Sequence, residues 1–163
     1  MKEFKTSILF LNYLVDCEEL LPGMKCFVIM PFGNPNADAQ HASRLESIYS
    51  NWIKPAIESA TLPGTQYEKI SCHRGDKTFR PGEVITHIIE NLVSSEIVFA
   101  DLSGKNANVF YELGVRHAVG NNCILISDNI DDVPFDLRPL RTIIYKYEPD
   151  SMLLLQDSLV ALD

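Results

Sequence analysis

Short apolar runs alternate along this chain with segments whose apolar residues recur at helical spacing. The apolar runs cover residues 25–30, 67–72, 96–101, 123–127 and 142–147, and the helical patterns cover residues 44–60, 81–92 and 108–120. This alternation is typical of βαβ units, in which crossover helices join parallel strands. We therefore expect an α/β fold with a five-stranded parallel sheet, in which a loop rather than a helix joins the last two strands.

Right-handed crossovers and short connections favour a flavodoxin-like sheet with strand order 2-1-3-4-5, flanked by helices. In such a sheet the strand order reverses between strands 1 and 3, and ligands bind outside the carboxyl ends of the strands at that point. The predicted site therefore lies at the loops that follow Met30 and Asp101.

The α/β pattern fills residues 24–163, so residues 1–23 are interpreted as an N-terminal extension to a single domain. Apolar residues at Phe4, Ile8, Leu11 and Val15 predict an amphipathic helix in that extension. It would pack on the flank of the sheet or against a second copy, unless the start codon is wrongly assigned. A closing helix is expected over residues 152–162.

The acidic balance of the chain limits its partners. Its 14 basic and 22 acidic residues give a formal net charge of −8. Such a chain repels nucleic-acid backbones and anionic membranes, so we expect neither as a partner. No apolar run approaches the ~20 residues that span a bilayer. Residues 7–15 lead into acidic residues without a small-residue cleavage site, which favours a cytoplasmic protein.

The four cysteines form no CxxC pair and have no zinc-type spacing to histidines, so we expect reduced thiols, no metal site and no cofactor. Walker-type, GxSxG, HExxH and GxGxxG motifs do not occur either. The chain is therefore not predicted to be an ordinary P-loop ATPase, serine hydrolase or zinc protease.

Polar and special residues gather at the predicted strand ends. Asp101, followed by Ser103 and Gly104, ends the third strand. Its carboxylate is suited to accept hydrogen bonds from sugar hydroxyls, or alternatively to form a turn. After the first strand come the other candidate ligand contacts of this edge, Met30, Pro31, Phe32 and Gly33.

The helix that follows the third strand carries further candidates. One of Asn106 and Asn108 is expected to be the N-cap, and the other to offer its amide to a base or sugar. The N-terminus of this helix also suits a phosphate. Glu112 falls on the flank of the helix, where it either reaches a ligand or pairs with Arg116 at i+4.

The loop after the second strand holds Arg74, Asp76 and Arg80. Two interpretations stand for it. Either the two arginines bind a phosphate beside Asp76, or the segment is a solvated turn that binds no ligand.

These segments together resemble the nucleoside 2-deoxyribosyltransferase-like superfamily, which adjoins the Toll/interleukin-receptor-like NAD-cleaving domains. The resemblance covers about residues 24–147. It rests on CFVIMPFG at 26–33, IKPAIE at 53–58, ADLSGKNANVFYELGVRHA at 100–118 and PFDL at 134–137. The block at 100–118 is its specific part.

The resemblance implies a flavodoxin-like fold and cleavage of the N-glycosidic bond between a base and a (deoxy)ribose. It implies that Glu112, in a Glu-Leu-Gly step, attacks the anomeric carbon, and that Asp101 holds sugar hydroxyls. Phe32 and Tyr111 would stack on the base or shield it from solvent, although both also suit core positions. The family's second acid falls on Asn106 here, a departure that favours hydrolysis or plain binding over transfer between bases.

Two functions of different class are consistent with these residues. The first is an N-glycosidase or (deoxy)ribosyltransferase, a hydrolase or transferase that acts on a nucleoside, a nucleotide or NAD. The second is a non-catalytic module that senses a nucleotide or binds a partner protein through the same cleft. A third, weaker hypothesis is an NAD-cleaving effector that is active only when protomers stack, and under each we expect a homo-oligomer.

Overall fold

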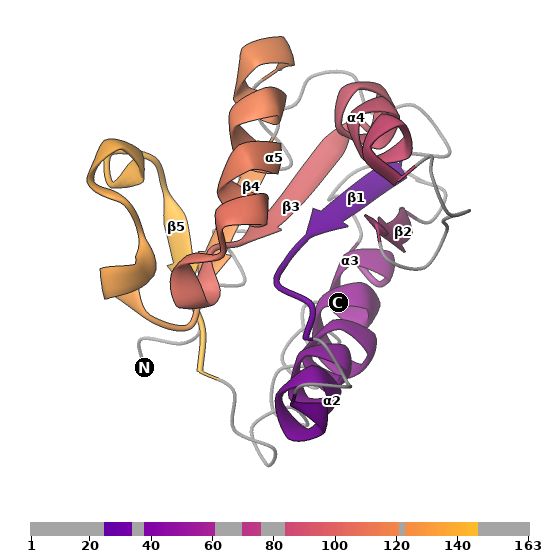
Figure 1. Ribbon diagram of the computed structural model, residues 1–163. Coiled ribbons are helices and arrows are strands. Elements are labelled where there is room, and N and C mark those ends of the chain that lie inside the picture. Colours follow the sequence, from indigo (N-terminus) through magenta and orange to yellow (C-terminus); the bar gives the residue numbers. More distant parts are fainter. Residues whose placement is uncertain (1–24, 34–37, 61–69, 76–83, 121–122, 147–163) are drawn as a thin grey trace.

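The computed structural model describes residues 25–33, 38–60, 70–75, 84–120 and 123–146 (Figure 1). The predicted N-terminal helix and closing helix lie outside the described residues, as do Asp76 and Arg80.

One parallel sheet carries the fold. Its strands are β1 (Lys25–Ile29), β2 (Ser71–Arg74), β3 (Ile97–Asp101), β4 (Cys123–Ser127) and β5 (Thr142–Ile144). They are hydrogen-bonded in the order β2-β1-β3-β4-β5, and every neighbouring pair is parallel. The flavodoxin-like α/β architecture is thus confirmed, with the strand order reversing between β1 and β3.

Two strands end more than one residue away from the predicted end. β2 continues to Arg74, two residues beyond the expected end at Cys72. The ion pair with the partly exposed Glu46 carboxylate lets the buried Arg74 occupy an inward position that hydrophobicity alone does not reveal. β5 stops at Ile144 rather than residue 147. The next residue, Tyr145, donates its backbone N–H to the carbonyl of Ser127 at 3.0 Å and then leaves the ladder.

The first crossover is one continuous helical segment of three parts. These are α2 (Ala39–Ile48), the π-helix η1 (Tyr49–Ile53) and α3 (Lys54–Glu58). It starts before the predicted residue 44 because Asp38 caps it, accepting a hydrogen bond of 2.9 Å from the N–H of His41.

The remaining connections agree with the prediction. α4 (Val84–Ser94) leads to β3, and α5 (Ala107–Val119) follows the short 3₁₀ turn η3 (Ser103–Lys105). A loop with two 3₁₀ turns, η4 (Ile130–Asp132) and η5 (Phe135–Leu137), joins β4 to β5. None of the helices within the described ranges is long and apolar enough to cross a membrane.

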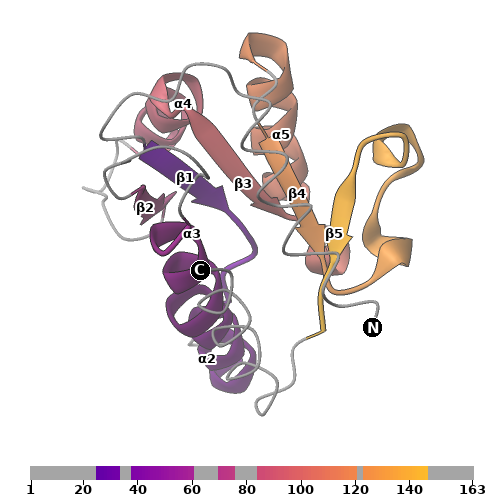
Figure 2. The same cartoon turned by 180° about the vertical axis from the view of Figure 1, so that it is seen from behind.

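Alternating side chains of the strands form a core on each face of the sheet. Cys26 and Val28 pack with Ile48 and Ile53 of the first crossover. Phe27 and Ile29 pack instead with residues of α4 and α5, including Leu92 and Leu113. Figure 2 shows the arrangement from behind, with α4 and α5 in the upper part of the view and α2 and α3 in the lower part. Both faces of the sheet are therefore covered, and the strand ends remain as the place for a site.

Candidate active site at the strand ends

Asp101 is the last residue of β3 and is fully buried, with 0% exposure. Its Oδ1 accepts hydrogen bonds from the N–H of Ser103 at 3.0 Å and from the Ser103 hydroxyl at 2.5 Å. Its Oδ2 accepts a bond of 2.9 Å from the hydroxyl of Tyr145. Both carboxylate oxygens therefore accept hydrogen bonds inside the protein, and because the side chain is fully buried a sugar hydroxyl reaches Asp101 only if neighbouring groups move.

Burial raises the pKa of Asp101 above its ordinary value, and the hydrogen bonds from Ser103 and Tyr145 act in the opposite direction. The carboxylate of Asp128 adds to the rise. Asp128 itself lies 3.6 Å from the guanidinium of Arg44.

The turn after Asp101 ties the ends of β3 and β4 together. The Ser103 hydroxyl accepts a hydrogen bond of 2.9 Å from the N–H of Asp128. Gly104 has a positive φ of 70°, a conformation that favours glycine, and its N–H donates to the Asp132 carboxylate at 2.7 Å. Ser103 and Gly104, both candidate ligand contacts, thus have structural partners.

Asn106 is the N-cap of α5, which settles which of the two asparagines has that role. Its side-chain oxygen accepts from the N–H groups of Asn108 and Val109, at 3.0 and 3.3 Å. These two amides are among those that a phosphate would use at a helix N-terminus, and they already have an acceptor. Asn108 itself is exposed and available to a ligand.

Glu112 lies in the second turn of α5 and is half-buried. Burial raises its pKa from 4.5 to about 7 and is the sole cause of the shift. Across the described ranges Glu112 has neither a hydrogen bond nor an ion pair. The residue therefore keeps a carboxyl group with free hydrogen-bonding capacity in a partly desolvated place.

Arg116 does not neutralise Glu112, although the i+4 spacing made that pairing one of the two expectations. Its buried guanidinium donates to backbone carbonyls around the end of α4, to Leu92 at 2.7 Å, Ser95 at 2.9 Å and Glu96 at 3.0 Å. Arg116 thereby joins α5 to α4. The alternative of reaching a ligand is the one left for Glu112.

The loop after β1 has both buried and exposed members. Met30 and Pro31 are buried, whereas Phe32 is 56% exposed and so is not a core residue. Tyr111 of α5 has the same 56% exposure. A Cβ at Gly33 would lie 2.6 Å from the Cα of Ala42, so the missing side chain lets this loop pack against α2. The two aromatic rings are therefore free to contact a base, and Gly33 acts through the fold.

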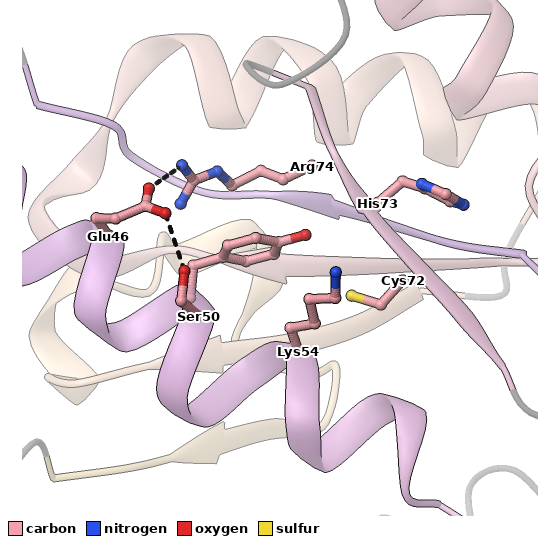
Figure 3. A pocket seen from close by; sticks show the side chains of 7 residues that line it. Glu46, Ser50, Lys54, Cys72, His73 and Arg74 are labelled. Atoms are coloured by element: carbon pink, nitrogen blue, oxygen red, sulfur yellow. Dashed lines mark hydrogen bonds and ion pairs between the residues drawn. The ribbon is translucent and has the colours of Figure 1, made fainter.

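A separate pocket of about 450 Å³ opens at the β2 edge of the sheet (Figure 3). Its walls are formed by Glu46, Tyr49, Ser50, Lys54, Cys72, His73 and Arg74. The guanidinium of Arg74 lies 2.6 Å from the Glu46 carboxylate and 4.2 Å from the centre of the Tyr49 ring. Arg74 is thus a buried, ion-paired residue, which excludes the solvated-turn interpretation for it, and its charge is already balanced.

Sequence reasoning assigned neither Tyr145 nor Trp52 a role at the site. The two rings meet edge to face, with centroids 5.2 Å apart and planes at 63°. Tyr145 could have been found, because a residue at the end of the fifth strand shares the sheet edge with Asp101. Trp52 could not, because its position depends on the π-helix.

No protein-family model matches this chain, and no curated protein is detectably similar to it in sequence. No cluster of metal-ligating side chains occurs in the part of the chain that the structure describes.

Proposed function

We propose that this protein cleaves the N-glycosidic bond of a nucleoside, a nucleotide or NAD, with Glu112 as the working carboxylate. The observation that carries the proposal is the state of Glu112. It is half-buried in the helix that begins at the strand ends, it has no partner among the described residues, and its pKa is raised to about 7 by burial. Such groups are typical of catalytic sites.

The chemistry needs a carboxylate of this kind. When the bond between C1′ and the base nitrogen breaks, its electron pair leaves with the base and positive charge develops on the sugar ring. An ionised Glu112 stabilises that charge, or bonds to C1′ to form a glycosyl-enzyme. Water then adds at C1′ and releases the sugar, while the base nitrogen takes up a proton. In a transferase, a second base would replace the water.

The Asn106 cap favours hydrolysis over transfer. In the family that the chain resembles, an acid at this position assists the leaving base. Here the side-chain oxygen at that position is engaged by two backbone amides of α5. Without a second acid, efficient exchange between bases is not expected.

The test is base release from a panel of nucleosides, nucleotides and NAD, followed by chromatography at low and high protein concentration. Glu112→Gln removes the charge and keeps the shape, so turnover should fall by at least about a thousandfold. Glu90→Gln, on the exposed side of α4, is the matched control and should retain wild-type turnover. Wild-type turnover by Glu112→Gln would overturn the proposal. Activity that appears only at high concentration would support the stacked NAD-cleaving effector.

The second candidate is a nucleotide sensor. The observation in its favour is that Asp101, the residue expected to hold sugar hydroxyls, has both oxygens engaged internally. A sensor would show a raised melting temperature with one member of the panel and no base release after long incubation.

We further propose a cytoplasmic homo-oligomer. Cys26, Cys72 and Cys123 are buried free thiols, as expected in a reducing compartment. Sedimentation tests the oligomer, and fractionation tests the compartment.

A further inference from the structure

Tyr145 lies directly after β5 and reaches across β4 to the end of β3. Its hydroxyl donates to Oδ2 of Asp101 at 2.9 Å and lies 3.3 Å from the hydroxyl of Ser103. It is the one donor to Asp101, among the described residues, that does not come from the adjacent β3–α5 turn. Without it, Oδ2 would have no hydrogen-bond donor within the described ranges, in a side chain with 0% exposure.

The ring of Tyr145 also packs against a residue of the first crossover helix, Trp52. The edge-to-face contact with Trp52 fixes it against the first crossover helix, on the face of the sheet opposite α5. Trp52 projects from η1, and π-helical turns occur often at functional sites. The chain of contacts Trp52, Tyr145, Asp101 therefore connects the two helical layers at the strand ends.

Asp101 also contacts the turn that leads into α5 and thereby restricts its position. Through Ser103 it holds the N–H of Asp128, and Gly104 in the same turn is held by Asp132. α5 begins at Ala107, directly after this turn, and carries Glu112.

We propose that Tyr145 is a positioning residue of the candidate active site, which holds the Asp101 carboxylate in place and orients the turn that delivers Glu112. The catalytic part of this inference rests on the proposed N-glycosidic cleavage. The effect on Asp101 does not, and it is measurable without any substrate.

The charged groups around Asp101 set the expected direction. Burial and Asp128 raise its pKa, whereas the bonds from Ser103 and Tyr145 lower it, and Arg44 is ion-paired with Asp128. Removal of the Tyr145 hydroxyl deletes one stabilising donor. The Asp101 carboxyl should then take up its proton at a higher pH.

The experiment compares Tyr145→Phe with Tyr49→Phe. Tyr49 is a buried tyrosine whose ring lies against the Arg74 guanidinium, and it is not one of the hydrogen-bond donors to Asp101. Carbon-13 NMR of aspartate carboxyl groups, assigned with Asp101→Asn, follows the titration of Asp101. We expect its midpoint to rise by about one pH unit in Tyr145→Phe, which lowers the ionised fraction about tenfold below the midpoint. Tyr49→Phe should leave it unchanged. An unchanged midpoint in Tyr145→Phe overturns the inference whatever the activity.

A double-mutant cycle then tests the catalytic part. If Tyr145 acts through Asp101, Tyr145→Phe lowers kcat by about tenfold in the wild-type background, with KM little changed, and has almost no further effect in Asp101→Asn. Equal losses in both backgrounds would show that Tyr145 does not act through Asp101. If the wild type releases no base while the titration shift is present, the proposed function fails and the positioning of Asp101 by Tyr145 stands.

Discussion

Asp101 and Glu112 are both carboxylates that burial removes from water, but their surroundings differ. Asp101 ends β3 and accepts three hydrogen bonds, from the Ser103 N–H, the Ser103 hydroxyl and the Tyr145 hydroxyl. Glu112, in α5, accepts none from the described residues. Burial raises the pKa of both. At Asp101 the hydrogen bonds offset part of the desolvation, whereas the described residues offset none of it at Glu112.

A compensated acid contributes to structure, and an uncompensated one is suited to react. Hydrogen bonds stabilise the ionised form of Asp101. The ionised form of Glu112 is destabilised by desolvation, and a ligand on which positive charge develops would stabilise it. Four substitutions or pH changes test this difference between the two acids, and their expected effects decrease from the first to the last.

The first change removes the arginine that sequence spacing assigned as a possible partner of Glu112. Arg116→Met deletes three buried bonds to the carbonyls of Leu92, Ser95 and Glu96, so the free energy of unfolding should fall by about 3 kcal/mol in urea denaturation. The pH midpoint set by Glu112 should not move, and an upward shift would show that Arg116 does stabilise its charge. Arg44→Met, which removes an exposed pair with Asp128, should cost at most about 0.5 kcal/mol.

The second change breaks the compensated site. Asp101→Asn replaces an acceptor with a donor inside a buried network, and should lower the free energy of unfolding by about 2 kcal/mol. Urea denaturation measures it, with Asp136→Asn at an exposed position as the control. No loss of stability in Asp101→Asn would mean that the three hydrogen bonds do not compensate the burial.

The third change uses pH to measure the uncompensated site. The pKa of Glu112 rises from 4.5 in the unfolded chain to about 7 in the fold, so its contribution to stability is fully present below 4.5 and is lost as the pH rises through about 7. Glu112→Gln does not titrate. Relative to wild type it should gain about 1–2 kcal/mol between about pH 4.5 and pH 8, a figure reduced for the partial exposure of the side chain.

Thermal or urea unfolding of both proteins across that range measures the gain. A difference that stays flat with pH would show that Glu112 has an ordinary pKa. The same ionisation predicts that base release rises with pH through about 7, because the proposed role needs the charged form.

The fourth change concerns the cap between the two acids. Asn106→Ala removes the acceptor for two amides of α5 and should cost about 1 kcal/mol, whereas Asn106→Asp keeps an acceptor and should stay within about 0.3 kcal/mol of wild type. Melting temperatures test both. A gain of base exchange in Asn106→Asp would show that the missing acid limits transfer, and a large loss of stability in Asn106→Asp would contradict a simple capping role.

The sheet could be predicted from the sequence because its information is local. Each strand is a short apolar run, each crossover a periodic segment, and the handedness of crossovers leaves few ways to order the strands. The same locality explains the errors. Arg74 has the sequence character of a loop residue, since the Glu46 carboxylate that allows it to be buried lies 28 residues earlier along the chain.

The candidate site could be predicted only in part, because the contacts that distinguish its residues join positions far apart in the sequence. Asp101 and Glu112 stand out because one ends a strand and the other lies near the start of a helix. The partners that distinguish them do not: Tyr145 is 44 residues from Asp101, and the carbonyls that engage Arg116 are 20 to 24 residues away. Sequence spacing therefore located the acids but could not tell the compensated one from the other.

The π-helix η1 makes the first crossover tolerant of one particular change in length. A π-helical turn takes one residue more than an α-helical turn, so η1 covers about the rotation and rise of an α-helical segment one residue shorter. Deletion of one residue from Tyr49–Ile53 would therefore let α2 and α3 merge into a regular helix, with α3 close to its present orientation and both Leu45 and Ile57 still in the core. Deletion of one residue from α2 or α3 would instead rotate the helix beyond it by about 100° and turn its apolar residues away from the sheet. Shortening of this helix should therefore be better tolerated within η1 than on either side of it.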